Sequence, residues 1–173
     1  MAAPGRPDFP ELVSRYGREL YVYLWRMLWN EQDAEDCLQE AFLRAYRAHP
    51  RMDGSANFRA WLYRIAGNMA RTQLKRRQRR DGREIELADE ALALQPAGGM
   101  DDGLERGERL QAVRAAVRRL PAKQQQSLIL RKYQGLSYAE IGAALRCSPE
   151  SARANVYQAL KRLRAELGAV RQT

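Results

Sequence analysis

The chain has 173 residues, 45% of them hydrophobic, so it can bury a core in one domain or in two small ones. Its net charge of +9 favours an anionic partner, although a basic protein without a specific partner would have the same composition. Cys37, Cys147 and His49 cannot form a zinc site by themselves, so we expect neither a metal nor another cofactor. No apolar run of about 18 residues and no signal-like N-terminus occur, so we expect a cytoplasmic protein without membrane insertion.

Ala, Leu, Arg and Glu dominate while Val and Ile are sparse, which predicts an all-α fold. Apolar residues at helical spacing predict three N-terminal helices, at about residues 9–29, 32–48 and 57–80. Residues 50–55 are typical of the loop before the third helix. The apolar stripe of the second helix consists of Leu38, Ala41, Phe42, Ala45 and Tyr46.

The opposite face of the second helix carries three carboxylates and two arginines: Asp33, Asp36, Glu40, Arg44 and Arg47. Three carboxylates on one exposed face would suit a basic partner. Pairs four residues apart, such as Glu40 and Arg44, also occur on ordinary solvated faces. From these residues alone, the solvated face is the preferred interpretation.

The third helix carries a basic stripe at positions i, i+4, i+7 and i+11, formed by Arg64, Asn68, Arg71 and Lys75. Cations beside aromatic rings suit single-stranded nucleic acid, because cations follow the phosphates while rings stack on bases. Phe58 and Trp61 lie on or near the apolar face, so we interpret both chiefly as core, with an exposed edge on Trp61.

Residues 84–105 contain seven carboxylates and no Lys or Arg, and residues 95–103 are rich in Gly, Pro and Asp. This composition predicts a flexible acidic linker over residues 84–103 between two basic lobes, 1–83 and 104–173. From composition alone, a solvated loop that balances charge is the preferred interpretation.

The second lobe is predicted to begin with helices at about residues 104–119 and 122–133, followed by Gly135 as a C-terminal cap. Residues 136–164 then read as two short helices with a tight turn between them. This is a helix-turn-helix signature, which presents one helix to a DNA major groove. A plain helical hairpin with a solvated polar face is the alternative.

The residues of this segment support the signature. Ser137 and Glu140 form a capping box, and Ser148 is a second N-cap with Pro149 at the first helical position. The last helix buries one stripe and exposes small and polar residues that suit base edges and phosphates. These exposed or flanking residues are Arg153, Ala154, Asn155, Tyr157, Gln158 and Lys161. Neither a Gly-rich phosphate loop nor a nucleophile motif is present, so no enzyme activity is expected.

These features, in this order, resemble the bacterial RNA polymerase sigma factors of the extracytoplasmic-function (ECF) type, which are built from two helical domains. The resemblance covers about residues 8–83 and 104–167. The matching segments are 33–46 (DAEDCLQEAFLRAY), 58–68 (FRAWLYRIAGN), 120–121 (LP), 135–141 (GLSYAEI) and the helix 148–163.

The resemblance implies a promoter-specificity subunit that binds core RNA polymerase and promoter DNA, both duplex and single-stranded. It assigns Asp33, Asp36, Gln39 and Glu40 to docking on the polymerase β′ clamp helices, which reverses the preference for a solvated face. The second lobe would contact the β flap, the linker would enter the active centre as a nucleic-acid mimic, and an anti-sigma factor is a further partner of the family.

The resemblance also assigns residues to the two promoter elements. The unwound −10 strand would be held by the third helix and the preceding loop, at Met52, Ser55, Trp61, Arg64, Asn68, Arg71, Thr72 and Lys75. The −35 duplex would be read by Arg153, Ala154, Asn155, Tyr157, Gln158 and Lys161.

Five residues depart from the family pattern: Met52, Thr72, Arg146, Asn155 and Gln158. Arg146 occupies a turn position that is often Gly, so a left-handed backbone there would carry modest strain. Fewer cations on the last helix imply weaker phosphate anchoring or a different −35 preference. The alternatives to a sigma factor are a stand-alone helix-turn-helix regulator and a basic protein that binds RNA or a membrane surface.

Overall fold

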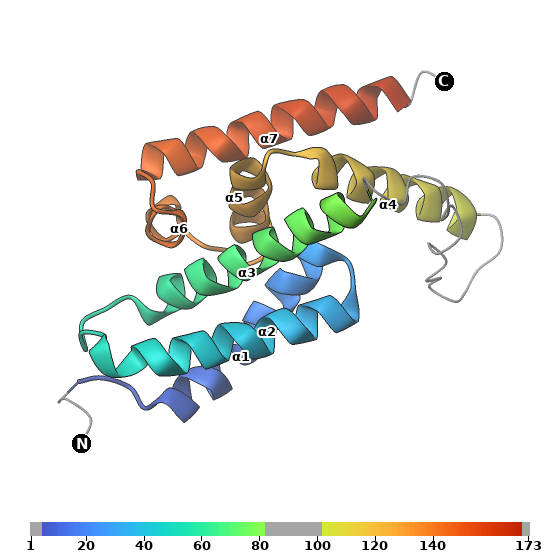
Figure 1. The fold of residues 1–173 in the computed structure, drawn as a ribbon. Coiled ribbons are helices and arrows are strands. Elements are labelled where there is room, and N and C mark those ends of the chain that lie inside the picture. Colours follow the sequence, from blue (N-terminus) through green and yellow to red (C-terminus); the bar gives the residue numbers. More distant parts are fainter. Residues whose placement is uncertain (1–4, 82–101, 171–173) are drawn as a thin grey trace.

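The computed structural model describes residues 5–81 and 102–170, and these ranges are helical throughout apart from turns. Figure 1 shows two groups of helices side by side, with α3 between α1 and α2 on one side and α5 and α6 on the other. The prediction of an all-α fold is confirmed. The N-terminal lobe consists of α1 (Phe9–Leu28), α2 (Glu31–Ala48), the 3-10 helix η1 (His49–Arg51) and α3 (Phe58–Asp81). The C-terminal lobe consists of α4 (Asp102–Arg119), α5 (Ala122–Lys132), α6 (Tyr138–Leu145) and α7 (Pro149–Val170).

The predicted acidic linker lies outside the described residues, except for its last two. Residues 102 and 103 belong to the first turn of α4.

A tight connection joins α1 to α2. The first helix ends at Trp29, whose backbone is left-handed with φ 50° and whose amide donates to the Trp25 carbonyl at 2.7 Å. The next residue, Asn30, caps α2, because its side chain accepts a hydrogen bond from the Asp33 amide at 2.8 Å. The two helices therefore turn back on each other without a loop.

Small residues form the buried side of α2: Ala34, Cys37, Ala41 and Ala45. They allow close approach to α1 and α3, where Tyr23 and Tyr63 meet edge to face with ring centroids 5.2 Å apart. The predicted apolar stripe of this helix is partly wrong. Tyr46 is 62% exposed, and its ring meets that of Phe9 with ring centroids 5.3 Å apart.

The helix-turn-helix forms as its caps predict. Ser137 and Glu140 make the complete capping box, and the Ser148 hydroxyl accepts from the Ser151 amide at 3.1 Å. Arg146 has a left-handed backbone, with φ 52°, so this departure from glycine carries modest strain. The turn after α6 is so tight that only glycine fits at position 142. A Cβ there would lie 2.6 Å from the Cys147 carbonyl oxygen.

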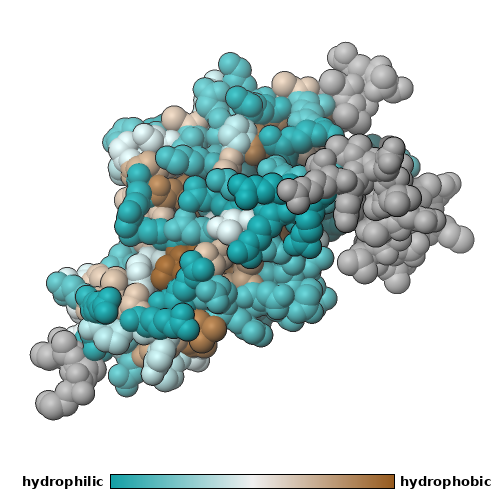
Figure 2. Space-filling model, in the orientation of Figure 1, coloured by the Kyte–Doolittle hydropathy of each residue, from teal (hydrophilic) through white to brown (hydrophobic). Residues whose placement is uncertain are grey.

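The two lobes share apolar packing. The buried cluster of α1–α3 continues into the C-terminal lobe through Ile129, Leu130, Leu136, Ile141 and Ala144. Hydrophilic residues predominate on the face shown in Figure 2, where apolar residues form only small separate areas. Among the described helices, none combines the length and apolar character needed to cross a membrane.

Candidate nucleic-acid and polymerase interfaces

Three residues of the predicted stripe on α3 lie together where the lobes meet. Arg64, Asn68 and Arg71 line a pocket of about 280 Å³ whose other wall comes from α5, α6 and the turn after α6. The Arg64 guanidinium donates to the Ala143 carbonyl of α6 at 2.5 Å. Arg71 donates to the Asn68 side-chain oxygen at 2.6 Å. The predicted −10 face is therefore partly covered by the helix-turn-helix.

The remaining predicted −10 residues divide into two groups. Thr72 is exposed beside the pocket between α2 and α3, where its hydroxyl donates to the Asn68 carbonyl at 2.9 Å, and Lys75 is exposed further along α3. Met52 and Trp61 are half-buried and pack against the core. This agrees with the interpretation of Trp61 as chiefly a core residue with an exposed edge.

The loop before α3 is held by its own hydrogen bonds. Ser55 is exposed, and its amide donates to the Asp53 carboxylate at 2.9 Å, which lowers the pKa of Asp53. Asn57 then caps α3 by accepting from the Ala60 amide at 3.0 Å. These bonds shape the loop before any ligand arrives.

The acidic face of α2 is exposed at two of its four predicted docking residues, Asp36 and Gln39. Glu40 pairs with Arg44 at 2.7 Å, and this hydrogen bond lowers the pKa of Glu40. Asp33 differs from the expected exposed carboxylate, because it faces α3. There it accepts from Gln73 at 2.9 Å and forms an ion pair with Arg77.

The predicted recognition face of α7 is open to solvent. Ala152, Val156 and Ala159 are buried against the lobe, and the other side of the helix is exposed. Of the predicted −35 residues only Asn155 is half-buried; the exposed ones are Arg153, Ala154, Tyr157, Gln158 and Lys161. Nothing in the described part of the chain covers this face as α6 covers α3.

Comparison with known proteins places both lobes in one family. Residues 12–80 match Sigma-70 region 2, and residues 110–163 match Sigma-70 region 4. The chain is 32% identical over 157 residues to the RNA polymerase sigma-H factor of Pseudomonas aeruginosa, covering 87% of this chain and 81% of that protein. It is equally similar, at 32%, to the ECF RNA polymerase sigma-E factor of Escherichia coli K12, with 87% and 82% coverage.

The chain belongs to the ECF sigma factors. It is thus a promoter-specificity factor for RNA polymerase, which is favoured over the stand-alone helix-turn-helix regulator.

Two solved structures resemble this sigma factor along most of its length. One is the sigma factor RpoE in complex with the anti-sigma factor NepR from Bartonella quintana, with a TM-score of 0.69 and 25% identity over 93% of this chain and 97% of that one. The other is CnrH in complex with the cytosolic domain of CnrY, with a TM-score of 0.67 and 26% identity over 93% and 88% of the two chains.

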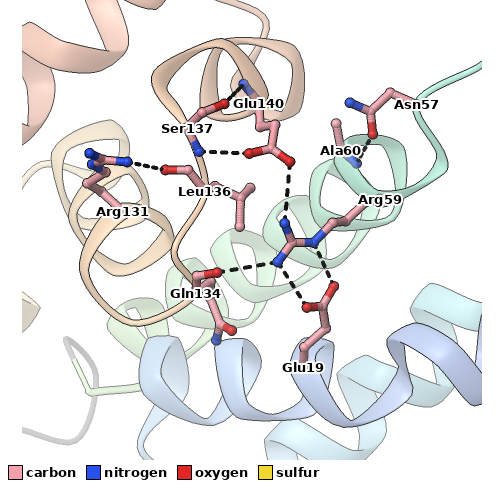
Figure 3. A network of polar contacts seen from close by, with 9 residues as sticks. All are labelled: Glu19, Asn57, Arg59, Ala60, Arg131, Gln134, Leu136, Ser137 and Glu140. Atoms are coloured by element: carbon pink, nitrogen blue, oxygen red, sulfur yellow. Dashed lines mark hydrogen bonds and ion pairs between the residues drawn. The ribbon is translucent and has the colours of Figure 1, made fainter.

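Sequence reasoning missed the polar contacts that join the two lobes of the sigma factor. Arg59 lies at their centre (Figure 3). Its guanidinium donates to Glu19 of α1 at 3.0 Å, to Glu140 of α6 at 3.3 Å and to the Gln134 carbonyl at 3.3 Å. The hydrogen bond with Glu19 raises the pKa of Arg59, so this arginine stays charged.

Two cation–π contacts extend the junction between the lobes. Arg26 of α1 lies 4.3 Å from the ring centroid of Tyr133, and Arg114 of α4 lies 4.7 Å from that of Trp29. No sequence signal marked these pairs, because their partners are far apart in the chain.

Glycine at position 67 permits one more contact between the lobes. The Gln126 side chain of α5 reaches over it to donate to the Tyr23 hydroxyl at 3.3 Å, and all three residues are buried. A Cβ at Gly67 would lie 2.6 Å from the Gln126 amide nitrogen and 2.9 Å from the Tyr23 oxygen.

Proposed function

We propose a division of labour among three faces of this sigma factor. The acidic face of α2, with Asp36, Gln39 and Glu40 at the surface and Asp33 behind them, docks on the β′ clamp helices of core polymerase. The α3 face traps the unwound −10 strand, and the α7 face reads the −35 duplex while its lobe contacts the β flap. The open recognition face of α7 is the observation that carries the proposal.

The covered α3 face implies that the lobes separate before the −10 strand binds. Arg64 is held by the Ala143 carbonyl, and Asn68 faces the same pocket. Asn68 itself is exposed, but a DNA strand that reaches Arg64 must break its hydrogen bond to α6. Docking on polymerase would supply the free energy for that separation, since a ligand favours whichever state it binds better.

Melting would then follow from differential binding. The loop with Met52 and Ser55 would hold an extruded base, while Arg64, Arg71 and Lys75 follow the phosphates. Duplex DNA offers no extruded base to this loop, so the melted state binds more tightly. The protein would act by binding alone, without a catalytic group, and in the cytoplasm with polymerase.

The solved relatives suggest a further partner. RpoE was captured with the anti-sigma factor NepR. We propose that an anti-sigma factor also binds this sigma factor in its closed form, because the match extends over both lobes.

Charge reversal on α2 tests the docking role. The double variant Asp36→Arg and Glu40→Arg should weaken binding to core polymerase by about a hundredfold, because like charges then face each other across the interface. Pull-down or fluorescence titration with core polymerase measures this.

The matched control is Glu31→Arg with Glu35→Arg, which makes the same charge change on the same helix at exposed positions outside the docking set. It should retain binding within a few-fold. Intact binding by the Asp36 and Glu40 variant would overturn the assignment of this face.

A further inference from the structure

The pocket between the lobes has an unusual charge composition. Its cations come from both lobes, with Arg64 and Arg71 on α3, Lys123 on α5 and Arg146 in the helix-turn-helix turn. The other residues that line it are neutral. Bringing four cations together without a carboxylate costs electrostatic free energy, which the closure of the lobes must overcome.

A second pocket, between α2 and α3, shows the contrast. It is similar in size, at about 340 Å³, and also contains two arginines, Arg44 and Arg76. There, however, Asp36 and Glu40 line the same space and balance the charge. Of these two pockets in the described part of the chain, one therefore has its arginines balanced by carboxylates and the other does not.

The cations of the pocket between the lobes retain hydrogen-bonding capacity. The Nε atoms of both Arg64 and Arg71 are buried without a hydrogen-bond partner. Burial, followed by repulsion from Arg146, lowers the pKa of Arg64, so its charge lacks compensation. Buried donors of this kind are stabilised most by a charged acceptor.

We propose that this pocket binds a small polyphosphate anion, which bridges the two lobes and stabilises the closed form. Tetrahedral phosphate oxygens suit several arginine and lysine donors at once. A volume of about 280 Å³ lies at the small end of the range for ligand pockets, which suits two or three linked phosphates. Because the donors come from both lobes, the anion binds the closed form more tightly than the open one. The assignment holds whether or not Arg64 also contacts promoter DNA.

Titration of the full chain with tripolyphosphate at constant ionic strength tests the site. The wild type should bind one tripolyphosphate, and the double variant Lys123→Gln and Arg146→Asn should bind about tenfold more weakly or worse. Both side chains are exposed, and asparagine tolerates the left-handed backbone at position 146, so the fold should persist. Circular dichroism checks this.

The matched control is Arg118→Gln with Lys132→Gln, two exposed cations outside the pocket. It makes the same charge change and should keep the wild-type affinity. Equal weakening in both double variants would show non-specific attraction to a basic protein and overturn the site. Absence of saturable binding to the wild type would overturn it as well.

The phosphates of a nucleic acid are the other anions that could bind the cations of this pocket. A single-stranded oligonucleotide, titrated in parallel, should bind with little dependence on Lys123 and Arg146. If these residues mattered for the oligonucleotide and not for tripolyphosphate, the pocket would be a DNA site and the proposal would fail.

A variant with loosened lobes tests the bridging role. Arg59→Ala removes the central contact between α1, α3 and α6. Tripolyphosphate should reduce the radius of gyration of this variant in small-angle scattering. It should have no such effect when Lys123→Gln and Arg146→Asn are added. A radius unaffected by the anion in Arg59→Ala itself would rule out bridging.

Discussion

The two faces that we propose to bind DNA differ in how accessible they are in the same structure. On α7, Tyr157 is 62% exposed and its neighbours on the recognition face are also open. On α3, Arg64 is half-buried and bonded to the backbone of α6. The covering element belongs to the helix-turn-helix itself. The α7 face is therefore open in the closed form, whereas Arg64 on the α3 face becomes free only when its hydrogen bond to α6 is broken.

The largest expected effect concerns the covered face. Replacing Asn68 and Arg71 with Ala together should reduce open-complex formation by about a hundredfold, because both side chains contact the melted strand in the proposed complex. Binding to −35 duplex should change less than twofold. Open-complex formation with core polymerase, followed by permanganate footprinting, measures the first quantity.

A control on the same helix is Arg80→Ala, an exposed cation on a different side of α3, which should behave as wild type. Equal losses in melting and in −35 binding by the Asn68 and Arg71 variant would remove the distinction between the faces.

A substitution on the open α7 face should affect −35 duplex binding rather than DNA melting. Gln158→Ala should weaken −35 duplex binding by about tenfold, consistent with the loss of one base-edge contact. Because this face is already exposed, the same factor should appear with the free protein and with the holoenzyme. A gel-shift or anisotropy titration under both conditions checks this, with Arg118→Gln as the control.

Weakening the contacts between the lobes should make the α3 face nearly as accessible as the α7 face. Arg59→Ala breaks the contact with Glu19 and Glu140, whose side chains are about a third exposed or less. We expect a several-fold rise in the population of separated lobes, seen as a larger radius in small-angle scattering. Arg44→Ala, which breaks an exposed pair within α2, should leave the radius unchanged.

The smallest effect is a dependence on pH. Hydrogen bonding to Ser137, and then the charge of Arg59, lowers the pKa of Glu140 from its ordinary value of 4.5. Its stabilising contribution is thus present above that value and is lost as pH falls through the lower, folded-state pKa. Urea unfolding of the wild type should show this loss in acid.

Glu140→Gln should flatten that part of the pH profile, since it removes the titrating group. An unchanged slope below pH 4.5 would show that Glu140 does not contribute to it.

Local signals in the sequence predicted the helices well. Caps such as Ser137 and Ser148 act on neighbouring backbone amides, so their effects are visible within three or four residues. The family pattern, which often has Gly at this turn position, marked position 146 as the place where a left-handed backbone would matter, and Arg146 has one. The family resemblance supplied roles that these signals do not carry, and the comparisons confirmed the family.

Contacts between distant segments were harder to predict. Helical periodicity showed that α5 and α6 have apolar faces, but not that the N-terminal lobe covers them. Asp33 shows the same limit for polar groups: it lies on the charged side of α2, yet Arg77 from another helix draws it away from solvent. The contacts of Arg59 could not be predicted from the sequence either, since its partners lie 40 and 81 residues away.

The absence of a side chain at Gly67 determines what a single mutation can do at this position. Every glycine codon becomes an alanine codon by one nucleotide change, so a methyl group can enter this crowded place in a single mutational step. Alanine favours the helix by about 1 kcal/mol over glycine. Here the methyl would also force the end of the Gln126 side chain away from Tyr23 and so break one contact between the lobes. We therefore expect Gly67→Ala, one nucleotide change away, to weaken the closed form even though it favours the helix.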